Sequence, residues 1–426
     1  MSTRRWNAVV GAICAAGIGV RLWFLFGIEP PIQEISDAGY YHLLGKNLAA
    51  GEGYLRPYEL LFDGTRTPTA EFPPLLPIIL AVPSLVGIDT ILGHRVVLSI
   101  LGGVTVFLVA LLAKRLAGQW AGLAAAACAA LHPMLIGADA SLMTEGVGAL
   151  LTAAVLLASL KLLDRPGVRP AVVLGALGGA AALLRGEGAL LLAGCLLVVL
   201  IVLVVRKVER PVAIGGAVAG TALAVMAPWL IRNAVVFDGL VMSNNLGSVL
   251  AGSYCDETFD GPWVGSWRLN EQCFYGYGFD RGLDEAEGAA EIRADAIEYA
   301  RDHLGEMPRV AAIRVARLFG VWDLEQQTTL AGFEARDPGA ERLGAYVTWA
   351  LIPLAAGGAL VVARRERAAL AVMAVPIITA VGTAAVTYGN QRFRVGADVV
   401  FIALAAALVS SVPALRARPA PEPAPD

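Results

Sequence analysis

A carboxylate lies where it could do chemistry. Asp37, in the run Ser36-Asp37-Ala38-Gly39-Tyr40-Tyr41, follows the first long apolar segment by about nine residues. A charged group at the edge of a bilayer is costly unless it is paired or functional. Partial burial would raise the pKa of this carboxyl and make it a better general base near neutral pH. Asp37 could equally cap a helix that begins near Ala38, and taken alone it favours that capping role.

The elements that hold this carboxylate are predicted to be membrane helices. The 426 residues are 57% hydrophobic and 16% charged, whereas soluble domains carry about 25% charged residues. The mean hydropathy is +0.65. The net charge is only −3 and no long basic run occurs, so we expect no nucleic-acid partner. The expected fold class is an all-α polytopic membrane protein.

Ten segments have the composition of a helix that crosses a bilayer, although two of them are short. They are 6–28, 95–117, 119–135, 141–163, 170–184, 188–205, 211–231, 340–362, 368–388 and 395–414. The apolar segment 75–88 is not counted, because it holds Pro77 and Pro83 and would invert every later loop. We predict that 75–88 is interfacial or re-entrant.

The basic residues give the orientation, since cytoplasmic loops are rich in Lys and Arg. With a cytoplasmic N-terminus, the loops on that side carry Arg4, Arg5, Lys114, Arg115, Lys161, Arg165, Arg169, Arg206, Lys207, Arg210, Arg364, Arg365, Arg367, Arg416 and Arg418. The short turns on the other side carry only Arg185, Arg392 and Arg394. Both termini are therefore predicted to be cytoplasmic.

This layout divides the chain into six parts. They are a first helix (1–28), an outer loop with Asp37 and the interfacial segment (29–94), helices two to seven (95–231), a second outer loop (232–339), helices eight to ten (340–414) and a disordered, Pro/Ala-rich cytoplasmic tail (415–426).

The second outer loop has three features of its own. Cys255 and Cys273, 18 residues apart, could form a disulfide if the loop faces an oxidising compartment. The segment 283–303 is rich in Ala, Glu and Arg and is predicted to be a surface helix. The segment 308–322 is expected to lie in the interface, with Arg309, Arg314 and Arg317 near lipid headgroups.

An ordered set of motifs runs through most of the chain. The set is Asp37-x-x-x-Tyr41, Gly51-Glu52-Gly53-Tyr54, Glu71-Phe72-Pro73-Pro74-Leu75-Leu76-Pro77, His132-Pro133, Thr144-Glu145, Leu184-Arg185-Gly186-Glu187, Pro228-Trp229-Leu230-Ile231-Arg232-Asn233, Tyr299-Ala300-Arg301-Asp302-His303 and Gln391-Arg392-Phe393-Arg394. In this order they resemble the GT-C membrane glycosyltransferases. The resemblance is to the group of the protein O-mannosyltransferases and the bacterial lipid A aminoarabinose transferase (glycosyltransferase family 39).

The resemblance implies a GT-C-like fold and an inverting glycosyltransferase that uses a polyprenyl-phosphate sugar. Nucleotide sugars are absent outside the cell, so an outward-facing site would need a lipid-carried donor. Asp37 would be the catalytic base. Arginine suits the leaving phosphate because its planar fork donates two hydrogen bonds. The arginines expected at the outer face are Arg66, Arg185, Arg232, Arg392 and Arg394; any of them could instead extend toward the interface as a lipid-facing residue.

Further outer-face side chains could contact the sugar or the acceptor. They are Tyr40, Tyr41, His42, Tyr54, Glu71 and Glu145. Each has a simpler alternative: tyrosines are common at membrane interfaces, and Glu145 could accept hydrogen bonds from amides at a helix start. Asp37, Glu71 and Glu145 could also supply oxygen ligands to a divalent metal, but their spacing is not diagnostic.

The sequence leaves the sugar and the acceptor open. The acceptor could be a glycan, a lipid or a protein. The Ala/Gly/Arg-rich, Lys-poor composition hints at a GC-rich bacterial genome, and we expect the protein in a bacterial plasma membrane. One rival interpretation is a transporter or flippase of polyprenyl-linked lipid, although transporters usually place polar residues at mid-membrane. Another is a membrane subunit that keeps the fold without catalysis, in which Asp37 would be dispensable.

Overall fold

The predicted all-α fold is confirmed. The computed structural model describes residues 1–411 apart from 34, 271–272, 274–283 and 335. This part contains helices and no strand beyond one antiparallel bridge between Leu55 and Pro68. The predicted tail 415–426 lies outside the described residues.

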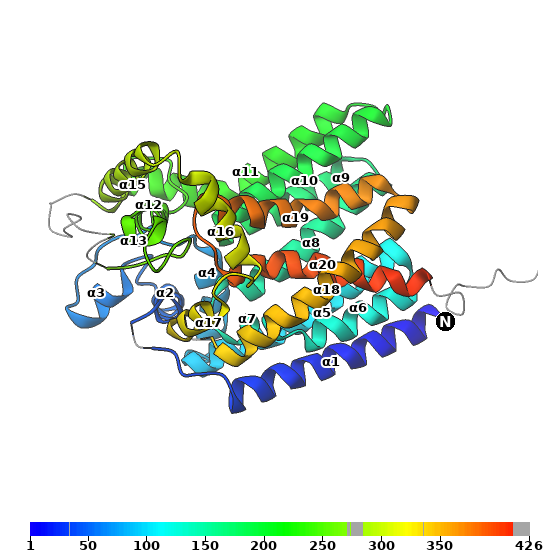
Figure 1. The fold of residues 1–426 in the computed structure, drawn as a ribbon, viewed down its shortest axis with the longest axis horizontal. Helices are drawn as coiled ribbons and strands as arrows, with labels where there is room; N and C mark the ends of the chain where they lie inside the picture. Colours follow the sequence, from blue (N-terminus) through cyan, green and yellow to red (C-terminus); the bar gives the residue numbers. More distant parts are fainter. Residues whose placement is uncertain (34, 271–272, 274–283, 335, 412–426) are drawn as a thin grey trace, which may run out of the picture.

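Long helices run side by side along the molecule (Figure 1). They are α1 (Thr3–Gly27), α5 (Ile91–Ala117), α8 (Thr144–Asp164), α9 (Val168–Leu184), α10 (Gly186–Val205), α11 (Pro211–Val236), α18 (Pro338–Arg365), α19 (Arg367–Val386) and α20 (Val395–Ala407). Two shorter helices, α6 (Gln119–Leu131) and α7 (Pro133–Ala140), meet at 55°.

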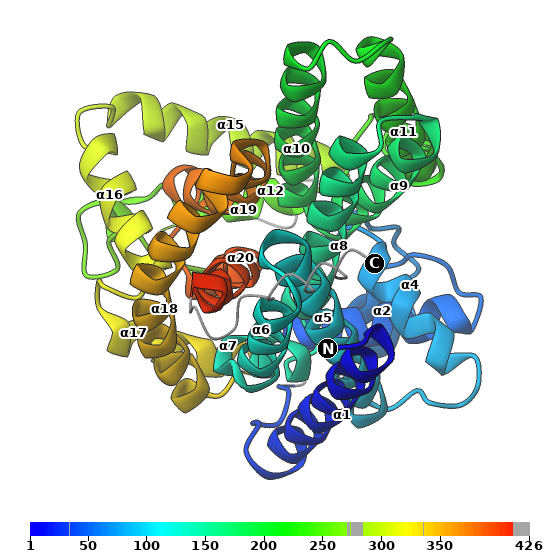
Figure 2. The same ribbon diagram turned by 90° about the vertical axis from the view of Figure 1, so that its right-hand side faces the viewer.

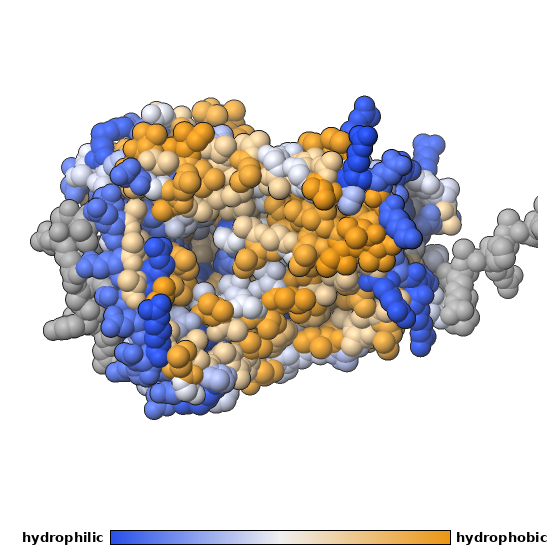
Figure 3. Space-filling view, turned by 90° about the horizontal axis from the view of Figure 1, so that it is seen from above, coloured by the Kyte–Doolittle hydropathy of each residue, from blue (hydrophilic) through white to orange (hydrophobic). Residues whose placement is uncertain are grey.

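The described residues contain eight helical segments that are long and apolar enough to cross a bilayer, the last of which joins α20 to two flanking 3₁₀ turns (Gln391–Ser411). The bent α6–α7 pair makes up to nine, and α9 is apolar but has only 17 residues. Each of the ten predicted crossings matches one of these elements. Figure 3 shows the result as an apolar band between two hydrophilic ends.

The shorter helices gather at the end of the bundle opposite the N-terminus (Figure 1). They are α2 (Asp37–Ala49), α3 (Pro57–Phe62), α4 (Leu75–Ser84), α12 (Asn245–Ala251), α13 (Asp256–Phe259), α15 (Glu285–Asp302), α16 (Met307–Leu318) and α17 (Leu324–Phe333). We call this part the head.

Helix α4 supports α2, which carries Asp37. At 10 residues α4 is too short to cross a bilayer, in agreement with the interfacial or re-entrant prediction for 75–88. A Cβ atom at Gly45 of α2 would lie 2.7 Å from the Cβ atom of Leu80 in α4. A glycine is therefore needed for the two helices to approach this closely.

Helix α20 forms the centre of the bundle. Figure 2 shows it end-on among its neighbours, and it packs against α5, α6, α8, α18 and α19. Its buried side chains are small or branched, including Val399, Ile402 and Ala403, which allows close helix packing. The 3₁₀ turn that precedes it, η1 (Gln391–Arg394), is thus joined directly to a deeply buried helix of the bundle.

Residues 232–339, predicted to be the second outer loop, form part of the head. Here the structure corrects one prediction. Cys255 and Cys273 are joined by a disulfide in the structure, and α15 is a largely exposed helix, as predicted for 283–303. Of the arginines expected near lipid headgroups in 308–322, however, Arg314 and Arg317 are fully buried. Their guanidinium groups hydrogen-bond to backbone carbonyls of Ser253 and Val264, so they stabilise the loop instead.

Candidate active site

Asp37 begins α2 but does not cap it. The hydroxyl of Ser36 accepts the hydrogen bond from the backbone N–H of Gly39 at 3.1 Å and is the N-cap. Within the described residues the carboxylate of Asp37 takes no hydrogen bond, and its side chain is open to solvent. The capping alternative is therefore wrong for Asp37, whose carboxylate is free for another role.

The charges around Asp37 come from helix ends. Burial under the surrounding head raises the pKa of the Asp37 carboxyl; Arg392 and Arg185 oppose this rise, and Glu145 adds to it. A side chain that is open to solvent and still surrounded by protein charges lies in a recess. Because its pKa is raised, the ionised carboxylate is a stronger base than an ordinary aspartate.

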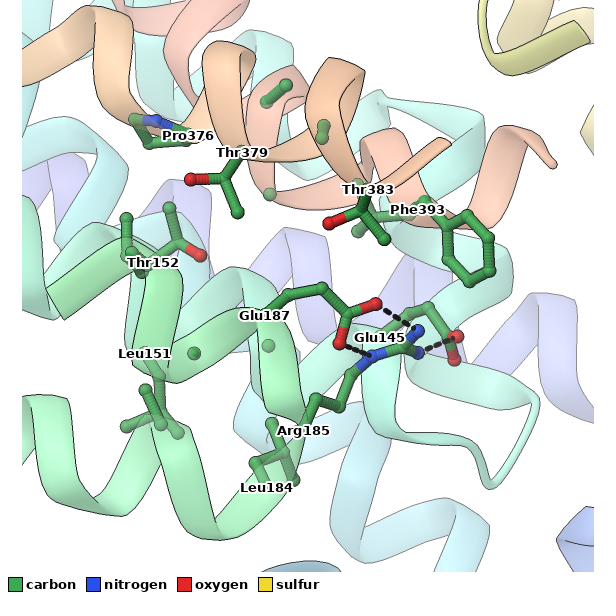
Figure 4. Close-up of a pocket in the computed structure, with 18 of the residues that line it drawn as sticks. Glu145, Leu151, Thr152, Leu184, Arg185, Glu187, Pro376, Thr379, Thr383 and Phe393 are labelled. Carbon is green, nitrogen blue, oxygen red and sulfur yellow. Dashed lines mark hydrogen bonds and ion pairs between the residues drawn. The ribbon is translucent and has the colours of Figure 1, made fainter. Parts of the chain in front are cut away.

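Arg185 connects two of these helix ends. It lies between α9 and α10, and its Nη1 donates to Glu145 Oε1 at 2.6 Å and to Thr144 Oγ1 at 2.9 Å. Its Nη2 and Nε bind the carboxylate of Glu187 at 3.0 and 3.3 Å. Figure 4 shows the guanidinium held between the two carboxylates. The arginine is therefore held in place by α8 and α10 together.

Arg392, in the turn before α20, is less fully bound. Its Nη2 donates to the Tyr388 hydroxyl at 2.7 Å. Its Nη1 lies 3.1 Å from Glu334 Oε1 and its Nε lies 3.8 Å from Glu145 Oε1. Neither Nε nor Nη1 makes a hydrogen bond to a described residue. These two nitrogens thus face carboxylates as ion pairs without being fixed by a hydrogen bond.

A pocket extends from this charged cluster into the bundle. It is enclosed by α8, α9, α10, α19 and α20 (Figure 4). Its charged end is made by Glu145, Arg185, Glu187 and Arg392, and its deeper wall includes Leu151, Thr152, Leu191, Pro376, Thr379, Ala380 and Thr383. A charged mouth above a mainly apolar wall fits an amphiphile that has an anionic head.

The segment around Glu71 forms the side of the head next to α2. Burial and the nearby carboxylates of Glu285 and Asp37 raise the pKa of Glu71 to about 7. The Tyr40 hydroxyl bonds Thr69 Oγ1 at 3.1 Å, and the Tyr54 hydroxyl donates to the Phe72 carbonyl at 2.9 Å. Both tyrosines therefore hold this segment in place.

Arg232 fastens the same segment to α11. Its Nη1 donates to the Thr69 carbonyl at 2.7 Å and its Nη2 to the Tyr54 carbonyl at 2.9 Å. Tyr41 is placed differently. It is buried, and the charges of Asp37, Arg185 and Glu145 are near enough to act on its hydroxyl. Of the four residues Tyr40, Tyr41, Tyr54 and Arg232, Tyr41 is thus the one next to the charged cluster.

Three other expected site residues lie apart from the cluster. His42 faces away toward α5, with its Nδ1 3.1 Å from Nδ1 of His94, and burial lowers its pKa to about 4. Arg66 is exposed and binds the carboxylate and carbonyl of Glu52. Arg394 is fully buried and donates to Asp398, Thr348 and the Leu318 carbonyl. All three of its guanidinium nitrogens bind internal groups, so Arg394 has no free donor for a phosphate.

The structure also brings in side chains that the sequence did not assign. Glu187 is the second carboxylate that binds Arg185. The spacing Arg185-Gly186-Glu187 could have indicated this pairing from the sequence. Tyr388 lies four residues before Arg392 and binds it. Glu334 reaches Arg392 from the end of α17, and no local pattern marks it.

The described residues contain no group of three or more His, Cys, Asp or Glu side chains arranged to hold a metal ion. Glu145 is committed to Arg185, and Glu71 lies beside Glu285 rather than beside Glu145. The suggested set Asp37, Glu71 and Glu145 therefore does not form a ligand cluster, and we derive no step through a metal.

Comparisons with known proteins can now be set beside this geometry. Residues 71–231 match the family model described as dolichyl-phosphate-mannose-protein mannosyltransferase. No curated protein matches the chain. The oligosaccharyltransferase of Archaeoglobus fulgidus in its apo form aligns with a TM-score of 0.53 and 15% identity, covering 96% of this chain and 50% of that one. The same protein with Zn and sulfate gives 0.52, 17%, 95% and 49%.

ArnT from Cupriavidus metallidurans, bound to undecaprenyl phosphate, aligns less well, with a TM-score of 0.40 and 16% identity over 96% of this chain and 77% of that one. The chain spans about half the length of the archaeal structures. The helical bundle, the matching 71–231 segment and the archaeal alignment agree on one architecture. This multi-pass membrane protein has the fold of the archaeal oligosaccharyltransferase structures, and its residues 71–231 resemble the mannosyltransferase family.

Proposed function

We propose that the chain is an inverting glycosyltransferase, which moves a sugar from a polyprenyl-phosphate donor to an acceptor hydroxyl on the extracytoplasmic side of a membrane. One observation carries the proposal. Arg185 and Arg392 lie at the charged end of an amphipathic pocket between the long helices, and both are close enough to Asp37 for their charges to act on its carboxyl. A lipid with a phosphate head suits this combination better than a water-soluble donor does.

The phosphate is assigned to Arg392 and Arg185. Arg392 has two guanidinium nitrogens without hydrogen-bond partners, and Arg185 lies on the other side of Glu145. The first isoprene units follow the wall formed by Leu151, Leu191 and Ala380.

The reaction is a single displacement. Asp37 removes the proton of the acceptor hydroxyl, and the acceptor oxygen forms a bond to the anomeric carbon from the face opposite the phosphate. The bond between that carbon and the phosphate oxygen breaks, and the phosphate keeps the electron pair. Arg392 and Arg185 stabilise the charge that develops there. One displacement inverts the anomeric configuration.

Tyr41 and Glu71 are the best-placed of the remaining candidates for contacts to the sugar or the acceptor. Tyr41 is influenced by the charge of Asp37, and Glu71 is close enough to Asp37 for the two carboxylates to affect each other. Tyr40, Tyr54 and Arg232 are assigned to support of the same segment, because their polar atoms bind backbone or neighbouring groups. The acceptor is a glycan, a lipid or a protein.

Two features support an extracytoplasmic site. The ends of the bundle away from the head carry most of the Lys and Arg residues of the short loops, and this distribution favours cytoplasmic termini. The head holds the Cys255–Cys273 disulfide, and disulfides persist in oxidising compartments. A bacterial plasma membrane fits this arrangement.

The experiment is Asp37→Asn, assayed in membranes for transfer from undecaprenyl-phosphate-linked mannose and aminoarabinose, the sugars of the resembling group. We expect a loss of roughly 10²- to 10⁴-fold in the rate, the usual contribution of a general base. Asp63→Asn removes an exposed carboxylate from the same loop and should leave the rate unchanged. Full activity in the Asp37→Asn protein would show that the assigned base is wrong.

A further inference from the structure

The two mouth arginines, Arg185 and Arg392, face more carboxylates than they can neutralise. Asp37, Glu145 and Glu334 all act on the Arg392 guanidinium. Arg185 is clamped by Glu145 and Glu187. Four carboxylates therefore share two guanidinium groups, and an ionised cluster carries an excess of negative charge.

This excess constrains how an anion can enter. Arg336 also acts on Glu334 and Glu145, but its buried ion-pair partner Glu341 adds one negative charge for this positive one, so the excess stays. A phosphate added to the cluster as it stands would meet like charges at close range in a partly desolvated site. It must replace one carboxylate on an arginine.

Glu334 is the carboxylate most directly on Arg392 and has few other contacts. Its Oε1 is 3.1 Å from Arg392 Nη1, and the same oxygen lies 3.5 Å from the Asn390 amide nitrogen. Its Oε2 is buried without a hydrogen-bond partner among the described residues. The carboxylate of Glu334 thus gives Arg392 an anionic oxygen acceptor, as a phosphate would.

The other carboxylates are less easily displaced. Glu145 and Glu187 are bound to Arg185 at 2.6 and 3.0 Å and lie within helices of the bundle. Asp37 makes no direct ion pair with Arg392 among the described contacts, and it is assigned to the acceptor. Glu334 comes from the end of α17 in the head, so it can move without disturbing a spanning helix.

We propose that Glu334 occupies the phosphate position on Arg392 in the free enzyme and is displaced when a polyprenyl phosphate binds. The inference rests on the proposed function, since it names the competitor at the same site. Burial and the neighbouring carboxylates also raise the pKa of Glu334, so a protonated Glu334 would leave the arginine readily. Glu334 is a positioning residue for Arg392 and contacts no reacting atom.

The test measures binding, not turnover. The dissociation constant for undecaprenyl phosphate is determined on the purified full chain in detergent micelles, for wild type, Glu334→Gln and Glu334→Ala. Both variants should bind about tenfold more tightly, the factor for removing one charged competitor from an arginine. Glu325→Gln, in the same helix α17 and exposed, is the matched control for charge and should bind as wild type does.

Each outcome decides the matter. Tighter binding by both Glu334 variants, with Glu325→Gln unchanged, supports the displacement. Equal or weaker binding by both variants, at a wild-type unfolding temperature, overturns it, and so does equal tightening by Glu325→Gln, which would indicate bulk charge. If neither wild type nor any variant binds undecaprenyl phosphate, the proposed function itself fails and the inference fails with it.

Discussion

Two groups of arginines in this protein differ in burial and in the groups that bind them. The framework arginines Arg314, Arg317 and Arg394 are fully buried and bind backbone carbonyls or one well-placed carboxylate. The mouth arginines Arg185 and Arg392 face a surplus of carboxylates, and Arg392 has two nitrogens without hydrogen bonds.

The difference shows that burial of an arginine does not by itself mark a site. A fully buried guanidinium whose three nitrogens all bind internal groups, such as that of Arg394, stabilises the fold, because it has no donor left for a ligand. The guanidinium of Arg392 lines a pocket, faces several carboxylates and has two nitrogens without a hydrogen bond to a described residue. Such an arginine can exchange one anionic partner for another. Arg392 and Arg394 illustrate both cases two residues apart in the same turn.

The largest effect is expected for this neighbouring pair. Arg392→Ala should lower kcat/KM for the polyprenyl-phosphate sugar by roughly a thousandfold, since it removes charge where the leaving phosphate develops it. Its unfolding temperature should stay near that of wild type, because the partly exposed pocket mouth can rehydrate.

Arg394→Ala is the matched contrast and should behave in the opposite way. It leaves the Asp398 carboxylate buried without its partner, which typically costs about 3–5 kcal/mol of stability. The measurements are transfer kinetics and thermal unfolding in the same detergent. A stable Arg394→Ala protein with no transfer activity, or an unfolded Arg392→Ala protein, would reverse the assignment of the two arginines.

The same contrast explains what the sequence could predict. Spanning helices follow from long apolar runs, whose hydropathy is a property of the chain itself. Each of the ten predicted segments overlaps a helix, and eight or nine of the described helical segments are long and apolar enough to cross a bilayer. Arg185 and Glu145 were found because each stands at a polar break between apolar runs. Arg66, Arg232, Arg392 and Arg394 share that signal, so the pattern could not separate ligands from framework.

What separates them is tertiary. The partners of Arg394 come from α16, α18 and α20, and the partner of Arg392 from the end of α17. Sequence spacing carries no information on such contacts. The contact of His42 is not predictable for the same reason, since its partner His94 lies 52 residues away. The helix cap was local but ambiguous: Ser36 and Asp37 are both good capping residues, and only the backbone geometry chooses Ser36.

A smaller effect is expected from Glu71, which lies between the two groups. Burial raises its folded-state pKa to about 7, above the value of about 4.3 for an unfolded chain. The folded state therefore favours the protonated carboxyl. The stability that this protonated form gives is complete below about pH 4, declines as the pH rises, and is lost once the pH exceeds about 7.

The measurement is the unfolding temperature of wild type and Glu71→Gln at pH 5 and pH 8. Wild type should lose more stability between these values than the variant does, by a few degrees. Comparison with the variant removes the contribution of other titrating groups. An identical loss in both proteins would mean that Glu71 titrates normally, and it would weaken its placement beside Asp37 and Glu285.

The smallest effect is expected from Arg66, which tests whether an exposed outer-face arginine belongs to either group. Its side chain is 57% exposed and pairs with Glu52, which is itself 41% exposed. Such pairs contribute only about 0–1 kcal/mol because water and salt screen them. Arg66→Ala should therefore change the unfolding temperature by less than about two degrees and kcat/KM by less than about threefold. Glu52→Gln should do the same.

A large fall in kcat/KM for Arg66→Ala alone would mean that the donor headgroup reaches the α2–α3 surface. In that case the phosphate site would have to extend beyond the two arginines at the pocket mouth.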